Sequence, residues 1–307
     1  MRTFSGVMPA LVTPFTPDDK PDLHVLRALV EYHLSKGVNG FYLCGSTGEG
    51  LALTVAERQA ITGTVLEQVA GRVPVLVHVG ALALHDAITL AIHAREQGAA
   101  AISSILPANY TTLDSLRAYF ERLAEAVPDL PLLPYLIHPQ IAPLQLMEAL
   151  LPIPGIGGTK YTGPDMYEMG QIIQMGQGRP WTVFSGMDEQ CVYAAMMGAN
   201  GCIGSTINLM PGAYLRLKAL VAGGRLAEAH DLQLRINRVT TVLIRYGVLA
   251  ALKYALGLLG FDCGQPRLPS SSLPAAQQPA LRAALEQQDF MALVHLTAPE
   301  PTTGTPA

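Results

Sequence analysis

The sequence has few charged and aromatic residues, and it lacks long apolar runs. Only 14% of its 307 residues are Asp, Glu, Lys or Arg, and the formal net charge is −4. Because the basic residues are scattered singly, we expect neither a nucleic acid nor a membrane surface as a partner. No apolar run is long enough to span a bilayer. Half of the residues are hydrophobic, which suits a large buried core and argues against a disordered chain.

Closely spaced cysteines and familiar cofactor motifs are also missing. Cys44, Cys191, Cys202 and Cys263 are far apart and stand in apolar surroundings. Without a CxxC pair, an HExxH pattern or a Walker A loop, the sequence predicts no metal site and no nucleotide cofactor. The first residues contain only a short apolar stretch, which runs into Pro-Phe-Thr-Pro and is a poor signal peptide. We therefore expect buried free thiols in a reducing, cytoplasmic protein.

Short β-rich runs alternate with amphipathic helical stretches as far as Gly223–Gly224. Eight strands, each followed by a helix, predict an α/β fold of the (β/α)8 TIM-barrel type. An open parallel sheet is the alternative, because strand order cannot be read from a sequence. The predicted strands are Val7–Val12, Gly40–Cys44, Pro74–Val79, Ala100–Ile105, Leu130–Tyr135, Gly155–Lys160, Thr182–Ser185 and Gly201–Gly204. Helical patterns cover Asp22–Lys36, Thr54–Val69, Leu84–Gln97, Leu113–Ala126 and Asp188–Met197.

The alternation stops after the predicted barrel, which we assign to residues 1–223. Residues 224–298 are predicted to form a helical extension, with helices at Arg225–Tyr246, Val248–Leu259 and Pro279–Gln288. The final nine residues, 299–307, read PEPTTGTPA and have almost nothing to bury, so we expect a disordered tail.

Lys160 is the one lysine that ends a predicted strand, where barrel enzymes carry their chemistry. Lys20 lies in a polar turn and Lys36 closes a helix, while Lys218 and Lys253 fall within helical segments, where a solvated or snorkelling side chain is expected. Burial at the barrel mouth disfavours a charged ammonium, and a neutral amine can attack a ketone to form a Schiff base. A lysine that only pairs with a carboxylate fits the same position.

Two further features stand after predicted strands. The loop Gly45–Gly50, with Ser46 and Thr47, can present backbone N–H groups and hydroxyls to a carboxylate. It can also be an ordinary turn that leads to a Thr54 helix cap. Tyr135 ends the fifth predicted strand, where a phenol can transfer a proton to or from a developing alkoxide. An amphipathic rim residue is the alternative for Tyr135.

In combination, the Gly45–Gly50 loop, Tyr135 and Lys160 resemble the dihydrodipicolinate synthase and N-acetylneuraminate lyase family. The resemblance runs from about Gly6 to Leu268. It implies a pyruvate Schiff base on Lys160, a pyruvate carboxylate held by Ser46 and Thr47, and proton transfer by Tyr135 with help from Ser46. It also implies a small-molecule keto acid substrate, a homotetramer, and no metal or organic cofactor.

The lyase branch is favoured because its sugar-binding positions are matched. They are Thr162, Gly186, Asp188, Glu189 and Ser205. Acidic and hydroxyl groups suit a polyhydroxylated chain, whose hydroxyls donate to carboxylates, although Asp188 and Glu189 also suit a helix N-terminus. The synthase branch has an arginine shortly after the tyrosine to bind a second carboxylate, and residues 135–141 contain none.

Two departures from the family pattern leave the substrate open. Leu136 follows the tyrosine directly and His138 comes before Pro139, which is displaced by one position. Asn109 stands where the family has a helper tyrosine, and Tyr110, one residue further, is a candidate relay. The prediction is a lyase that cleaves a 2-keto-3-deoxy sugar acid, N-acetylneuraminate first, to pyruvate and an aldehyde. The alternatives are an aldolase or dehydratase of a 2-keto-3-deoxygluconate-type acid, a synthase-like condensation, and a non-catalytic ligand-binding paralogue.

Overall fold

The computed structural model describes residues 2–107, 112–137 and 140–297. The tail that we predicted at 299–307 lies outside these residues. Within them, eight parallel strands form one sheet in the order β1-β8-β7-β6-β5-β4-β3-β2. The strands are β1 (Gly6–Pro9), β2 (Phe41–Leu43), β3 (Val75–His78), β4 (Ala101–Ile105), β5 (Leu132–Ile137), β6 (Gly158–Thr162), β7 (Thr182–Ser185) and β8 (Gly201–Gly204).

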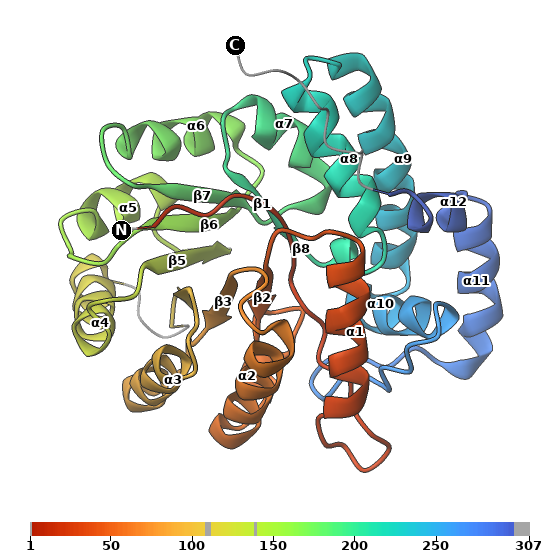
Figure 1. The fold of residues 1–307 in the computed structure, drawn as a ribbon, viewed down its shortest axis with the longest axis horizontal. Helices are drawn as coiled ribbons and strands as arrows, with labels where there is room; N and C mark the ends of the chain where they lie inside the picture. The colour runs from red at the N-terminus through yellow and green to blue at the C-terminus, as the bar shows by residue number, and fades with distance from the viewer. Residues whose placement is uncertain (1, 108–111, 138–139, 298–307) are drawn as a thin grey trace.

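The sheet closes between its first two strands. Ala10, just after β1, forms a parallel bridge with Tyr42 of β2, and the Leu11 N–H donates to the Tyr42 carbonyl over 2.9 Å. Strands thus circle a common axis, and helices form the outer ring (Figure 1). The predicted (β/α)8 barrel is confirmed, and the open sheet is ruled out.

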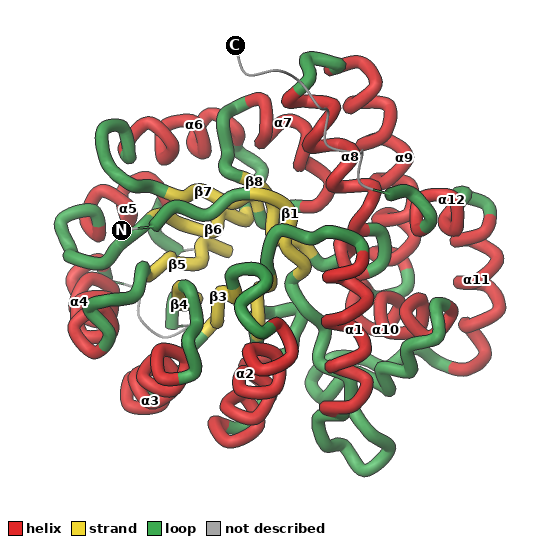
Figure 2. The backbone as a smooth tube through the Cα atoms, viewed as in Figure 1, coloured by secondary structure: helices red, strands yellow, loops and turns green. Residues whose placement is uncertain are grey.

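Helices join successive strands on the outside of the barrel (Figure 2). The sequence analysis gave no range for three of them, α5, α6 and α8. The ring consists of α1 (Leu23–Ser35), α2 (Val55–Val69), α3 (Leu84–Glu96), α4 (Leu113–Ala126), α5 (Pro143–Leu150), α6 (Met166–Met175), α7 (Cys191–Met196) and α8 (Pro211–Ala222). Thr54 caps α2 and exchanges hydrogen bonds with Glu57, as the loop's alternative interpretation predicted.

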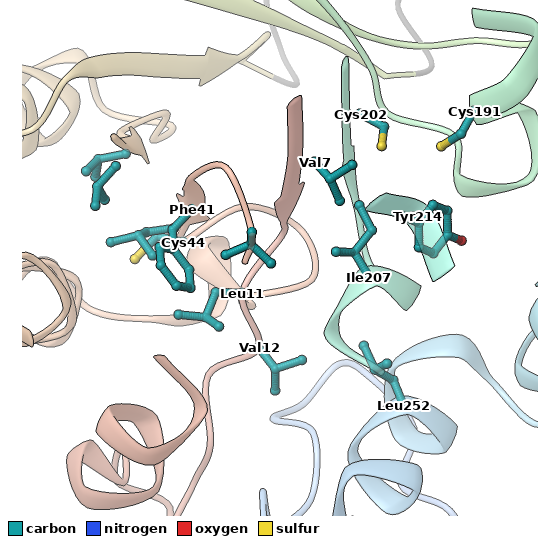
Figure 3. Packing of buried hydrophobic residues seen from close by; sticks show 14 of the residues in the cluster. Val7, Leu11, Val12, Phe41, Cys44, Cys191, Cys202, Ile207, Tyr214 and Leu252 are labelled. Carbon is teal, nitrogen blue, oxygen red and sulfur yellow. The ribbon is translucent and has the colours of Figure 1, made fainter. Parts of the chain in front are cut away.

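The core has two layers because successive strand side chains point to opposite faces of the sheet. On β2, Phe41 and Leu43 pack outward against the helices, whereas Tyr42 points into the barrel. Figure 3 shows part of the outer layer. The interior is filled by Phe4, Met8, Ala10, Tyr42, Leu76, Ala101, Leu133, Phe184 and Ile203.

A C-terminal helical part follows the barrel, as predicted. It comprises α9 (Leu226–Arg245), α10 (Val248–Leu258), α11 (Gln278–Glu286) and α12 (Phe290–Val294), of which α12 was not foreseen. Helix α9 packs on α8, and α10 packs on α9. The division of the chain at residue 223 stays a prediction. In the described residues no single helix is long and apolar enough to cross a membrane; α9 and α10 meet the criteria of length and composition only as a pair, with a bend of 114° between them.

Candidate active site

Tyr135 and Lys160 lie side by side inside the barrel. They are register partners on β5 and β6. Both strands continue two residues further than predicted, to Ile137 and Thr162, so the expectation that Tyr135 and Lys160 end their strands was wrong. Because alternate strand residues share a face, Thr162 points to the same side as Lys160, one step nearer the mouth.

The Lys160 amine is buried among aromatic rings. Lys160 is 4% exposed, and its Nζ lies 4.2 Å from the ring centroid of Tyr135 and 4.4 Å from that of Tyr42. In the part of the chain that the structure describes, none of the ion pairs includes Lys160. The geometry therefore favours an amine available for chemistry over a carboxylate-paired lysine.

The electrostatics of this pocket prepare Tyr135 for proton transfer. Burial on its own raises the pKa of Tyr135. The Lys160 charge and hydrogen bonding by Ser46, Thr162 and Lys160 outweigh burial, and the pKa is lowered from its ordinary value. A phenol with a lowered pKa gives up its proton more readily, which is what a general acid–base residue needs.

The rings of Tyr42 and His78 lie 6.1 Å and 6.2 Å from the Tyr135 ring, and neither residue was predicted to belong to the site. The Ile105 N–H donates to His78 Nε2 over 3.0 Å, so Nδ1 carries the proton and donates to the Cys44 carbonyl over 2.9 Å. Burial and nearby Arg58 hold the pKa of His78 well below its ordinary value. The signal was present in the sequence: both residues occupy inward positions of predicted strands.

Ser46 and Thr47 stand at the mouth, on the loop after β2. Ser46 is exposed and Thr47 half-buried, and Thr47 Oγ1 lies 2.7 Å from Ser205 Oγ on the loop after β8. Cys44 and Glu49, on either side of the hydroxyl pair, have positive φ values of 54° and 56°. Such backbone strain in non-glycine residues often accompanies a functional site.

Asp188 lies on a short 3-10 turn after β7, next to the loop that follows β8. Its Oδ2 accepts hydrogen bonds from Thr206 N at 2.8 Å and Thr206 Oγ1 at 3.0 Å. Burial raises the pKa of Asp188 to about 6; the Thr206 hydrogen bonds oppose this rise, and the Glu189 charge adds to it. Gly204 is required here, because any Cβ at that position would overlap Asp188 Oδ1.

Helix α9 holds the turn that carries Asp188 and half-buried Glu189. Gln233 Nε2 donates to the Asp188 carbonyl over 3.0 Å, and Asn237 Nδ2 donates to the Glu189 carbonyl over 3.1 Å. The C-terminal helices therefore reach the mouth of the barrel.

Gly186 keeps space open beside the amine. A Cβ at Gly186 would overlap Thr162 Oγ1 and lie 3.0 Å from Lys160 Cε. Of the predicted site residues, Tyr110 lies outside the described residues. His138, which departs from the family pattern, lies outside them too. The roles of the others stay predictions.

Two sequence-based expectations about other polar side chains had opposite outcomes. All four cysteines are buried and free, as predicted. Lys253 is 2% exposed and pairs with Glu49, so the solvated or snorkelling side chain expected in its helix was wrong. Among the residues described, no group of three or more His, Cys, Asp or Glu side chains is arranged to hold a metal ion.

Comparison with known proteins agrees with this architecture. The model of the dihydrodipicolinate synthetase family matches residues 3–288. The N-acetylneuraminate lyase of Rhizobium meliloti is 36% identical over 283 residues, which is 91% of this chain and 94% of that protein. Among solved structures, the Proteus mirabilis N-acetylneuraminate lyase is 29% identical with a TM-score of 0.89, over 94% of this chain and 100% of that one. A catalytic lysine mutant of the Ruminococcus gnavus sialic acid aldolase is 26% identical with a TM-score of 0.89, over 95% and 99%.

Fold and relatives together define a (β/α)8-barrel enzyme of the lyase class. The chain belongs to the dihydrodipicolinate synthetase family. The resemblance seen in its motifs is therefore confirmed.

Proposed function

We propose that this protein is a class I aldolase that cleaves a 2-keto-3-deoxy sugar acid, N-acetylneuraminate first, to pyruvate and an aldehyde. The observation that carries the proposal is the buried Lys160 amine, 4.2 Å from the ring centroid of its register partner Tyr135. The names of the relatives, N-acetylneuraminate lyase and sialic acid aldolase, support the choice of substrate.

The proposed mechanism uses only side chains of this chain. The Lys160 amine attacks the keto carbon, and the carbinolamine takes up a proton and loses water to give an iminium. The bond between the first and second carbons beyond the iminium carbon then breaks. Its electron pair moves towards the iminium nitrogen, and an enamine forms. Tyr135, assisted by Ser46, accepts the proton of the hydroxyl that becomes the aldehyde. Protonation of the enamine and hydrolysis of the imine release pyruvate. The reaction in this form needs no metal and no organic cofactor.

Substrate recognition divides between two groups of residues at the mouth of the barrel. Ser46 and Thr47 are proposed to hold the carboxylate through hydroxyls and backbone N–H groups. The hydroxylated chain extends towards the ends of β6, β7 and β8, where acidic and hydroxyl groups can accept and donate hydrogen bonds. We assign this second role to Thr162, Gly186, Asp188, Glu189 and Ser205.

The test is pyruvate release from N-acetylneuraminate by the wild type, by Lys160→Ala and by Lys218→Ala. Lys218 is a half-buried lysine on α8, outside the site, and serves as the matched control. We expect release by the wild type and the control and none by Lys160→Ala. Full activity in Lys160→Ala would overturn the mechanism. Treatment with pyruvate and borohydride should leave a reduced adduct on the wild type and none on Lys160→Ala.

A second candidate substrate is a 2-keto-3-deoxygluconate-type acid, handled by aldol cleavage or dehydration. Asn109 in place of the helper tyrosine favours it. A substrate panel separates the two, because preference for the nine-carbon N-acetylated sugar excludes the shorter acid. A synthase-like condensation is disfavoured by the absence of arginine at residues 135–141. An adduct on Lys160 together with turnover would exclude a non-catalytic paralogue.

We also propose a cytoplasmic homotetramer. Four free cysteines support a reducing compartment. Leu51 and Leu82, 65% and 61% exposed, border a cavity of about 680 Å³ at the mouth side of the barrel, and such exposed apolar side chains support burial against another copy. Light scattering during gel filtration tests the assembly, and a monomer mass would contradict it.

A further inference from the structure

A buried ion pair joins the C-terminal helices to the loop that carries Ser46 and Thr47. Lys253 lies on α10, and its Nζ is 2.6 Å from Glu49 Oε1, with side-chain exposures of only 1% and 3%. The same Nζ lies 4.1 Å from the ring centroid of Phe15 and donates to the Gln265 carbonyl over 3.3 Å. The pair links residues more than 200 positions apart in the chain.

Glu49 occupies a backbone conformation that favours glycine. Its φ of 56° and ψ of 28° are left-handed, yet the position carries a long acidic side chain with both neighbours glycine. The Glu49 N–H donates to the Ser46 carbonyl over 3.1 Å, and so the Glu49 backbone contacts the proposed carboxylate-binding residue directly. This arrangement indicates that the carboxylate, rather than an unstrained backbone, is required at Glu49.

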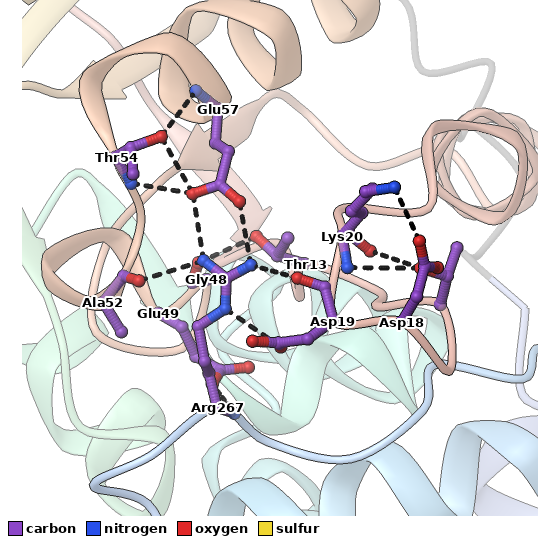
Figure 4. Close-up of polar contacts among 11 residues, drawn as sticks. Thr13, Asp18, Asp19, Lys20, Gly48, Glu49, Ala52, Thr54, Glu57 and Arg267 are labelled. Carbon is purple, nitrogen blue, oxygen red and sulfur yellow. Dashed lines mark hydrogen bonds and ion pairs between the residues drawn. The ribbon is translucent and has the colours of Figure 1, made fainter.

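The second carboxylate oxygen of Glu49 is also bound by the C-terminal part of the chain. Glu49 Oε2 accepts from the Arg267 N–H over 2.6 Å. The Arg267 guanidinium, in turn, contacts Asp19 Oδ1 at 3.1 Å, Glu57 Oε1 at 2.8 Å and the Ala52 carbonyl at 3.0 Å (Figure 4). Both carboxylate oxygens of Glu49 are therefore attached to the segment 253–267.

A buried ion pair is a weak source of stability, because desolvation of two charges offsets most of their attraction. Apolar residues of similar volume often serve as well or better for stability alone. What an ion pair adds is a defined position for each charged group. Here that position fixes the turn between Gly48 and Gly50, and with it the two hydroxyls.

We infer that Lys253 and Glu49 are positioning residues for carboxylate binding: α10 holds Glu49, and Glu49 holds the Ser46–Thr47 backbone in the geometry that receives the keto acid's carboxylate. The inference rests on the proposed function. It gives the C-terminal helical part a role in substrate binding. Ser46 and Thr47 would touch the substrate, whereas Lys253 and Glu49 act through them.

The test replaces both charges at once in the full-length protein, as Glu49→Met with Lys253→Met. The matched control is Arg282→Met with Glu286→Met, which removes an exposed pair on α11. Half-saturation by pyruvate is measured from the rate of borohydride trapping, and thermal midpoints are recorded in parallel. We expect half-saturation to rise about tenfold in the Glu49/Lys253 variant, with an unchanged rate at saturation and no shift in the control.

The thermal midpoint and the half-saturation together separate a positioning role of the ion pair from a purely structural one. A lower thermal midpoint with unchanged half-saturation would make the pair purely structural and overturn the inference. No adduct on the wild type would instead overturn the proposed function. Glu49→Asp keeps the charge and shortens the side chain, so it supplies a second variant if the double variant fails to fold. Unchanged half-saturation in Glu49→Asp would also count against positioning.

Discussion

Lys160 Nζ lies 4.2 Å from the ring centroid of Tyr135, its register partner on the neighbouring strand. The lysine charge lowers the pKa of the phenol, against the effect of burial. In the proposed reaction the iminium forms on the same nitrogen, so its positive charge also lies beside the phenol. The two residues therefore form one electrostatic unit, and a change at Tyr135 should be felt at the proton-transfer step.

Tyr135→Phe separates imine formation from bond cleavage. The ring that packs beside Lys160 remains, but the hydroxyl that accepts the proton is lost. We expect the rate of pyruvate release from N-acetylneuraminate to fall by about 10²–10⁴-fold, the usual contribution of a general acid–base residue. Borohydride trapping with pyruvate should persist, and loss of trapping in a variant that keeps the wild-type thermal midpoint would contradict this separation.

The barrel and its lysine could be predicted from the sequence because both depend on local patterns. The strand alternation around Tyr42 and the glycine-flanked run that ends at Lys160 are visible in a few consecutive residues. The strand ends at Tyr135 and Lys160 were placed two residues early. Thr162 extends the β6 ladder by pairing with Ile137, and register of this kind depends on the neighbouring strand.

Long-range contacts of the candidate site were beyond sequence analysis. Lys253 stands on a helix, where a lysine is usually solvated, and its partner Glu49 is more than 200 residues away. Gln233 likewise gave no signal, although it is buried and bonds to the backbone at Asp188 and Val192. Only the fold brings α9 and α10 to the loops of the mouth. Local sequence patterns do not predict contacts between residues so far apart in the chain.

Gly186→Ala tests whether the space beside the amine matters. The added Cβ would overlap Thr162 Oγ1 and press on Lys160 Cε, at 3.0 Å. We expect a loss of at least about tenfold in kcat/KM for pyruvate release, a cost of about 1.4 kcal/mol in transition-state binding.

The matched control for Gly186→Ala is Gly257→Ala on α10, where no atom lies within 4 Å of the new Cβ. It should leave activity unchanged and raise the free energy of unfolding by about 0.5–1 kcal/mol, since alanine favours a helix over glycine. Wild-type activity in Gly186→Ala would show that the mouth relaxes around the methyl group and would remove Gly186 from the site.

Asp188→Asn makes the raised pKa of Asp188 measurable. Its folded-state pKa is about 6, against an ordinary value of 3.8. Between these values the folded protein binds more protons than the unfolded chain, so this group makes stability fall as pH rises through that window. The loss is complete above pH 6 and amounts to about 3 kcal/mol, from 1.36 kcal/mol per pKa unit. Because asparagine does not titrate, the Asp188→Asn variant does not lose this stability as the pH rises.

We therefore expect the free energy of unfolding of Asp188→Asn, relative to the wild type, to rise between pH 4 and pH 7.5, as measured by urea denaturation. Substrate binding, in contrast, should be weaker in the variant than in the wild type. For the wild type we expect KM for N-acetylneuraminate to fall as pH rises through about 6, because an ionised carboxylate accepts stronger hydrogen bonds from the substrate's hydroxyls. The variant should have a higher KM that lacks this dependence. A KM profile identical to that of the wild type would mean that Asp188 does not bind the substrate and only holds Thr206.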